Sequence, residues 1–241
     1  MNYSKYTLTA TLLMSLITCH RCMADTSYTV TSHDALQSII DNCNDSAYNK
    51  VTIYMQPGIY QPFSAISDAN LEPRYISFVG LEDGTEGVTV ESTSGYYTEP
   101  AAELRLNGTV SDVTFISSHP EGIVNTTDNG AYAVHADYGS MNTDFNNCTF
   151  ISYQTAAVGM GITNDSEVTF NKCRFENRAN RTFGTEWRLG ALYAHAAPLA
   201  YGLSGAKLKI VDCSYTYPDS AHGWLVVKDH NGASIETVVI A

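Results

Sequence analysis

Charge is scarce in this chain of 241 residues, and positive charge is the scarcer sign. Charged residues make up 16% of the sequence, and 13 lysines and arginines stand against 25 aspartates and glutamates, which gives a net charge of −12. A strongly acidic protein repels phosphate backbones, so we expect no nucleic acid partner. The same repulsion disfavours polyanionic sugars, and a neutral or cationic glycan matches the charge better.

Proline and long apolar runs are sparse as well. The sequence has 7 prolines against 16 tyrosines, and 44% of its residues are hydrophobic. This composition favours strands over linkers and supplies enough apolar surface for a core. The apolar run at residues 6–19 is shorter than the roughly 20 residues of a membrane-spanning helix, so no membrane span is expected.

The beginning of the chain has the pattern of a secretory signal. A positive charge precedes the apolar run, and small residues precede Asp25. These features predict a signal peptide over residues 1–24, a single domain over residues 25–241, and a secreted or periplasmic protein. Basic residues lie close to the predicted cut, so a retained anchor and a true start at Met23 stay open as alternatives.

A helix is predicted near the start of the domain, and strands are predicted after it. Ser32 can cap the helix, and Leu36, Ile39 and Ile40 have the spacing of one apolar helical face. From Val51 onward, short β-rich segments alternate with Gly, Asn, Asp and Ser. This order suggests a helix that caps one end of a β architecture.

An internal repeat determines which β architecture this is. The sequence FNNCTF at 145–150 recurs as FNKCRF at 170–175, and a weaker copy, IVDCSY, lies at 210–215. A second apolar segment precedes each copy, at 131–135, 155–159 and 191–195. A shared motif at variable spacing predicts a coil with fixed strands and variable loops. The predicted fold is all-β, a single-stranded right-handed parallel β-helix with an N-terminal capping helix.

Stacked coils would bring the cysteines of the repeat together. Equivalent positions on successive coils lie about 4.8 Å apart, so Cys148, Cys173 and Cys213 are expected to form an inward column. We favour an interior ladder of small apolar thiols, although this spacing would also allow a disulfide. The cysteines lack the close CxxC pairs of a zinc site.

Several segments resemble the pectin-lyase-like superfamily of right-handed β-helices. Residues 51–60 and 76–80 are similar to the opening turns of pectinesterases, and residues 145–154 resemble their F-x-N-C-x-F-x-G-Y-Q-D-T segment. This resemblance implies that Gln154 is an oxyanion-type hydrogen-bond donor. Thr155 stands where that family has its acid/base aspartate, and the nucleophile motif D-F-I-F-G has no counterpart, so the pectinesterase carboxylates are not matched.

The chain also resembles the pectate-lyase-like modules of phage tail proteins and tailspikes. The resemblance lies in residues 132–137 and in the Asn-Asn-Cys strand that ends at Gln154. Such modules typically bind or cleave polysaccharide on the host surface, often as trimers. The resemblance therefore implies a glycan partner.

Aligning the coils places His135, Gly159 and His195 in one approximate row. The two histidines would then lie about 9–10 Å apart, with a notch at Gly159 wide enough for a sugar ring. Asp137 follows His135 by two residues and shares its face. A histidine beside a carboxylate can act as a general base, so His135, Asp137, Gln154 and His195 are the candidate catalytic residues. Histidines that hydrogen-bond between coils are the structural alternative.

Aromatic and charged residues supply candidate contacts to a substrate. A tryptophan beside charged groups is a common platform for a sugar, because its face covers C–H groups while its neighbours bind hydroxyls. Partial burial of ordinary loop aromatics is the alternative. The acidic residues are spread over loops, so neither a calcium site nor a cofactor is predicted. The candidate substrate-binding residues are Tyr153, Glu186, Trp187, Arg188 and Tyr193.

Two functions follow from these observations. The first is a secreted enzyme that binds and cleaves an extracellular polysaccharide, as a lyase or a hydrolase. The second is a non-catalytic glycan-binding or adhesion module, such as a phage tail or cell-surface structural component. The apolar strand at 238–241 could also pair with another copy, which predicts a homo-oligomer formed through the C-terminal end.

Overall fold

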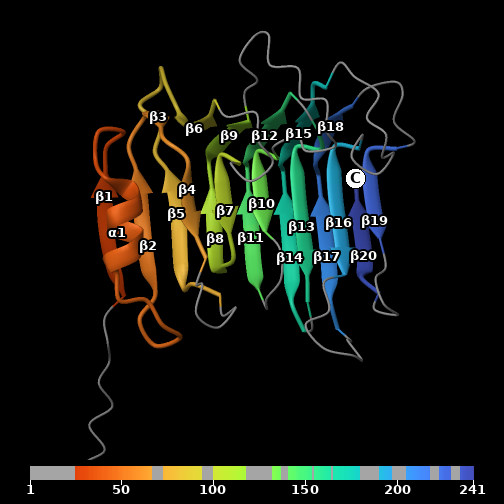
Figure 1. Ribbon diagram of the computed structural model, residues 1–241, viewed down its shortest axis with the longest axis horizontal. Helices are drawn as coiled ribbons and strands as arrows, with labels where there is room; N and C mark the ends of the chain where they lie inside the picture. Colours follow the sequence, from red (N-terminus) through yellow and green to blue (C-terminus); the bar gives the residue numbers. More distant parts are fainter. Residues whose placement is uncertain are drawn as a thin grey trace, which may run out of the picture.

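The structure is a computed structural model. It describes residues 25–66, 73–93, 100–117, 132–136, 141–153, 155–163, 165–179, 190–196, 205–217, 223–228 and 234–241. All pairs of named strands are parallel, and the strands form three sheets of eight, six and six strands. Figure 1 shows the coils stacked on one another from β1 to β20, so that each sheet runs along the length of the stack.

The largest sheet, called sheet 1, contains β1 (Thr26–Val30), β2 (Val51–Met55), β5 (Ile76–Gly80), β8 (Asn107–Ser111), β11 (Asn142–Asn146), β14 (Glu167–Asn171), β17 (Lys207–Val211) and β20 (Glu236–Ile240). Sheet 2 contains β3 (Gly58–Tyr60), β6 (Val88–Ser92), β9 (Val113–Ser117), β12 (Thr149–Ser152), β15 (Arg174–Asn177) and β18 (Ser214–Thr216). Sheet 3 contains β4 (Phe63–Ala65), β7 (Ala102–Leu104), β10 (Val134–Ala136), β13 (Val158–Ile162), β16 (Leu192–Ala196) and β19 (Leu225–Lys228).

From β2 onward, the chain passes from sheet 1 to sheet 2 to sheet 3 and then starts the next coil. Each strand pairs with the strands of the coils before and after it, as Phe145 pairs with Phe170 and Phe150 with Phe175. Parallel strands of one sheet that are joined by a crossover connect almost always with a right hand. The predicted all-β, right-handed parallel β-helix is confirmed.

A single left-handed residue makes the corner between sheets 1 and 2 in four coils. Asp112, Asn147, Lys172 and Asp212 occupy this position, with φ between 50° and 59°. Asn and Asp adopt this backbone conformation more readily than most residues, because their short polar side chains can hydrogen-bond locally. Asn147 Nδ2 donates a hydrogen bond of 2.7 Å to Asp112 Oδ1. The corners are thus tied from coil to coil.

Phenylalanines and cysteines form ladders inside the coil. Phe150 stacks on Phe115 and Phe175, with ring centroids 5.8 and 5.3 Å apart. Cys148, Cys173 and Cys213 follow the left-handed residues of their coils, and no disulfide joins any of the cysteines that the structure describes. The Sγ atoms of Cys148 and Cys173 each contact a backbone carbonyl at 3.4 Å. The predicted interior ladder of thiols is confirmed.

The predicted helix is present as α1 (Leu36–Asn42), but the predicted cap at Ser32 is wrong. The N-cap position is Ala35, which makes no side-chain hydrogen bond. Asp34 instead accepts hydrogen bonds from the backbone N and the Oγ1 of Thr31, at 2.5 and 2.9 Å. The turn before the helix is therefore closed by Asp34, two residues nearer the helix than Ser32.

The helix lies beside the first coil, next to β4 (Figure 1). Gln37 makes two hydrogen bonds to the backbone of Ser64, from its Nε2 to the carbonyl at 2.9 Å and from the amide to its Oε1 at 2.8 Å. Leu36 and Ile40 are buried in the core. The side-chain amide of Gln37 thus forms hydrogen bonds with backbone groups of β4, the edge strand of sheet 3, which has no strand before it to pair with. No helix in the described ranges is long and apolar enough to cross a membrane.

Candidate functional site

The outer face of sheet 3 carries the two candidate catalytic histidines, but in different rows. The register places His135 opposite Gly159 and Gly159 opposite Tyr193. His195 lies opposite Gly161, two residues farther along the strand. The predicted pairing of His135 with Gly159 is therefore confirmed, and the placement of His195 in the same row is wrong. Side chains alternate with a period of two, so this slip leaves both histidines on the outer face.

The predicted notch at Gly159 is also wrong, because an aromatic ring fills it. A Cβ atom built on Gly159 would lie 2.4 Å from the Cζ atom of Tyr132. Tyr132 is only 7% exposed and forms a small apolar cluster with Ala156 and Tyr193. Glycine is needed here to admit the protein's own tyrosine, and no sugar ring can occupy the same space.

His135 has an acidic partner on the preceding strand of the sheet. Its Nδ1 lies 3.7 Å from Oε1 of Glu103, which is the residue paired with His135 in the register. The hydroxyl of Ser64, one coil earlier, lies 3.5 Å from Glu103 Oε2. The ring of Tyr132 stacks on the imidazole at 5.3 Å and 11°. These contacts hold a carboxylate and an imidazole together on the outer surface of the coil.

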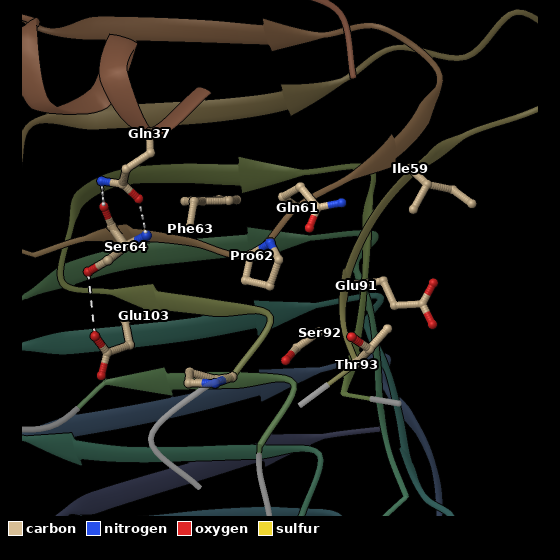
Figure 2. Close-up of a pocket in the computed structure, with 11 residues that line it drawn as sticks. Gln37, Ile59, Gln61, Pro62, Phe63, Ser64, Glu91, Ser92, Thr93 and Glu103 are labelled. Atoms are coloured by element: carbon tan, nitrogen blue, oxygen red, sulfur yellow. Dashed lines mark hydrogen bonds between the residues drawn. The ribbon is translucent and has the colours of Figure 1, made fainter. Parts of the chain in front are cut away.

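Glu103 also belongs to a groove between sheets 2 and 3 (Figure 2). The groove has a volume of about 550 Å³, within the usual range for ligand sites. Figure 2 shows Glu91 on the β6 side and Glu103 on the β7 side. The lining residues are Gln37, Ile59, Gln61, Pro62, Phe63, Ser64, Glu91, Ser92, Thr93, Pro100 and Glu103.

The groove combines an apolar surface with many hydrogen-bonding groups. Ile59, Phe63 and two prolines supply the apolar part, while amides, hydroxyls and two carboxylates supply polar groups. None of the lining residues that the structure describes is lysine, arginine or histidine. A few polar groups that orient a ligand over apolar walls are typical of small-molecule and sugar sites. The two carboxylates make this described part of the lining unfavourable for an anionic ligand.

A second polar cluster lies on the outer face of sheet 2. Glu176 is buried, and its carboxylate lies 2.5 Å from Nε of Arg174 and 2.6 Å from Nε of Arg178. The guanidinium of Arg178 lies over the ring of Tyr153 at 5.4 Å and donates to its hydroxyl at 2.7 Å. Tyr153, a predicted substrate contact, is 38% exposed. Its ring is therefore accessible, although an arginine covers one face.

The remaining predicted residues fall into two groups. Tyr193 is buried, with its ring stacked on His195 at 5.4 Å. The other predicted residues lie outside the described residues, and their roles stay predictions. They are Asp137, Gln154, Glu186, Trp187 and Arg188. Within the described part of the chain, no three His, Cys, Asp or Glu side chains are placed to hold a metal ion.

Neither Glu103 nor the groove was predicted from the sequence. Glu103 lies in the segment 101–106, which also contains the charged but buried Arg105, so charge alone does not identify the functional position there. The partner of His135 was expected two residues along the same strand, at Asp137, whereas the described partner comes from the neighbouring coil. Only the register between coils shows this proximity.

Comparisons with known proteins return structures but no sequence relatives. No protein-family model matches this sequence, and no curated protein does. A solved structure of a pectin methylesterase in complex with a hexasaccharide is similar to this chain, with 13% identity and a TM-score of 0.49 over 82% of this chain and 68% of that one. Pectin methylesterase from carrot has 10% identity and a TM-score of 0.43, with 87% of both chains covered.

A third similar structure is pectin methylesterase PemA from Erwinia chrysanthemi. It has 9% identity and a TM-score of 0.43, over 88% of this chain and 92% of that one. These proteins belong to the group whose motifs this sequence resembles. At this level of similarity, however, the strand order and register of the chain itself establish its fold, and its function is argued from its own side chains.

Proposed function

We propose that this protein binds a polysaccharide in the groove between sheets 2 and 3. The observation that carries the proposal is the composition of the groove, in which two carboxylates, two amides and three hydroxyls surround the apolar Phe63 and two prolines. Sugars present hydroxyl groups around a ring with apolar C–H faces. A groove with both kinds of surface can satisfy both parts of a sugar.

The charge of the site narrows the class of polysaccharide. Neither the groove nor the protein as a whole favours an anion, because the described lining holds two glutamates without a lysine, arginine or histidine, and the net charge is −12. A neutral or cationic glycan therefore matches the site. The shape of the fold also suits a polymer, because the groove opens on the side of a coil along which a chain can continue.

Binding can be tested with variants of one lining residue and a matched control. Gln61 lines the groove and is exposed, while Gln56, also exposed, lies outside the lining. On an array of neutral and cationic glycans, we expect Gln61→Ala to weaken the binding of the best ligand several-fold and Gln56→Ala to leave it unchanged. Equal losses in both variants, or an array without any bound glycan, would refute binding in this groove.

Cleavage is a second candidate function, favoured by the contact between Glu103 and His135. A carboxylate 3.7 Å from Nδ1 can orient the imidazole and stabilise its protonated form, so that the ring can take up a proton during catalysis. We expect His135→Ala to abolish the release of new reducing ends from a bound polysaccharide, and His195→Ala, on the neighbouring row, to retain it. Undiminished release in His135→Ala would remove this residue from the mechanism.

Two properties of the whole protein complete the proposal. Secretion or export to the periplasm rests on the predicted signal peptide over residues 1–24. Self-association through β20 rests on Val238, Val239 and Ile240, which are 40%, 49% and 49% exposed. Light scattering checks the second property, and a clean monomer at high concentration would count against it.

A further inference from the structure

We infer that the groove selects a glycan with free amino groups, held as an ammonium at Glu103 with Glu91 on the opposite wall. This inference rests on the proposed function and names the class of its ligand: a polysaccharide that contains hexosamine residues without N-acetyl groups.

The lining contains negative charge on both of its walls. Glu91 belongs to β6 of sheet 2, and Glu103 belongs to β7 of sheet 3 (Figure 2). None of the described lining residues is a lysine, an arginine or a histidine that could neutralise them. His135, whose Nδ1 lies 3.7 Å from Oε1 of Glu103, is charged only when it is protonated. A cation that enters the groove therefore meets carboxylates from two sheets.

The contacts of Glu103 hold its carboxylate in place without burying it. Ser64 Oγ lies 3.5 Å from Oε2, and His135 Nδ1 lies 3.7 Å from Oε1, so each oxygen has one neighbour on the outer face of sheet 3. The side chain of Glu103 is 34% exposed. An ionised carboxylate has about four acceptor sites, so these two contacts leave capacity for a donor from the ligand.

An organic ammonium matches this arrangement better than a metal ion. No cluster of three metal-ligating side chains exists among the residues that the structure describes. An ammonium group carries three donors and needs only one carboxylate, with hydroxyls or amides for the rest. Ser64 and Thr93 supply hydroxyls in the groove, and Gln61 supplies an amide. A free amino sugar can therefore satisfy its charge and its donors in one position.

N-acetylation of the ligand would remove this interaction. An acetamide carries no charge and has a single N–H, so the ion pair with Glu103 is lost and one hydrogen bond to the carboxylate remains. Losing the positive charge of the donor is expected to lower the affinity by about tenfold, because an ionised partner makes a hydrogen bond roughly twice as strong. The preference for free amines is thus expected to be about tenfold for each ammonium that reaches a carboxylate.

The experiment compares two oligosaccharides that differ only in acetylation. A tetramer of β-1,4-linked glucosamine and a tetramer of N-acetylglucosamine are titrated by calorimetry into the full-length protein, at a mildly acidic pH that keeps the amines protonated. We expect the glucosamine tetramer to bind about tenfold more tightly than its acetylated partner. Higher ionic strength should reduce this ratio, because it screens the charges of the exposed carboxylates.

Variants locate the preference within the molecule. Glu103→Gln should bring the two affinities together by weakening only the amine form, and Glu91→Gln should act in the same direction. Glu86→Gln is the matched control, because it changes the net charge by the same amount from an exposed loop outside the lining. Unchanged thermal unfolding of each variant shows that the fold is intact. If one of the two groove variants perturbs the structure locally, the other still tests the preference for amines.

The outcomes separate this inference from the proposal on which it rests. Equal binding of both tetramers, or tighter binding of the acetylated one, overturns the preference for amines and leaves glycan binding in the groove intact. A loss in Glu86→Gln as large as that in Glu103→Gln overturns the site, because general charge attraction then explains the preference. Binding of neither tetramer overturns the inference, and glycan binding itself falls only if the wider array also shows no ligand that depends on Gln61.

Discussion

Replacing Gly159 by alanine tests how the outer face of sheet 3 is built. The new Cβ would lie 2.4, 2.5 and 2.7 Å from the Cζ, Cε1 and Cδ1 atoms of the Tyr132 ring. Carbon atoms in contact are normally about 3.5–4.0 Å apart, so the ring would have to retreat by about 1 Å. The φ angle of Gly159 does not lie in the left-handed region that glycine favours, so the steric contact with the ring is the change that alanine introduces.

The ring has little room for this retreat. It stacks on His135 at 5.3 Å, packs with Ala156 and Tyr193, and is only 7% exposed. Forcing an extra methyl group into a packed site typically costs about 1–3 kcal/mol. We expect Gly159→Ala to lower the free energy of unfolding by this amount, which corresponds to a fall of about 2–4 °C in Tm for each kcal/mol in a domain of this size. Urea denaturation and thermal unfolding measure both quantities.

A double-mutant cycle identifies the cause of the loss. In a Tyr132→Ala background the obstacle is gone, so Gly159→Ala should cost less than about 0.5 kcal/mol or even stabilise the fold by restricting the unfolded chain. The coupling energy between the two positions should therefore be about 1–3 kcal/mol. If Gly159→Ala costs the same in both backgrounds, the tyrosine does not fill the notch and the argument against a sugar ring at Gly159 fails.

Three further predictions concern the rest of the chain. Asp45→Ala should lower the free energy of unfolding by about 2–3 kcal/mol in urea titrations, because Asp45 forms an ion pair with Arg74 at 2.7 Å whose side chains are 7% and 15% exposed, and the guanidinium then keeps its hydrogen bond to the Ile40 carbonyl but loses this charged acceptor. Stability should fall as pH rises from about 9 to 12, because the neighbouring Cys148 thiol and, to a smaller extent, burial raise the pKa of Cys173 to about 12, while the unfolded thiol ionises near its usual pKa. In Cys173→Ala this part of the pH dependence should disappear. Mass spectrometry of the exported protein should find a chain that begins at residue 25, and a chain that keeps residues 1–24 would contradict the predicted signal peptide.

The repeat in the sequence predicted most of the fold, because copies of the repeated segment lie directly opposite each other on neighbouring coils. Two copies of the Phe-Asn-x-Cys-x-Phe segment align in the structure as they do in the sequence, with Phe145 opposite Phe170 and Phe150 opposite Phe175. Each segment contains the left-handed corner and the inward residues on both of its sides. A one-residue corner permits only one alignment between neighbouring coils, so the sequence pattern is unambiguous there.

The register of sheet 3 could not be predicted in the same way. The segments at 155–159 and 191–195 both alternate small and large apolar residues, and a shift by two residues leaves the inward and outward positions unchanged. The pattern therefore placed His195 on the correct face and in the wrong row. The pairing of Val158 with Leu192 corrects it. Likewise, no local motif could show that Tyr132 reaches across to Gly159 in the next coil.

Connection lengths explain why the groove lies where it does. Single left-handed residues make the corner between sheets 1 and 2 in the four coils that begin with β8, β11, β14 and β17, whereas residues 56–57 and 81–87 make it in the two coils that begin with β2 and β5. The connections from sheet 2 to sheet 3 vary, from residues 61–62 in the first complete coil to residues 93–101 in the next. The groove is lined by Gln61 and Pro62 of the first connection and by Thr93 and Pro100 of the second. The corner between sheets 2 and 3 is thus where the first coils leave space for a ligand. The groove depends on the difference in length between these two connections and on outward-facing residues from two sheets. Its residues are therefore dispersed in the sequence, and the stacking of the coils brings Glu91 and Glu103 to the same site.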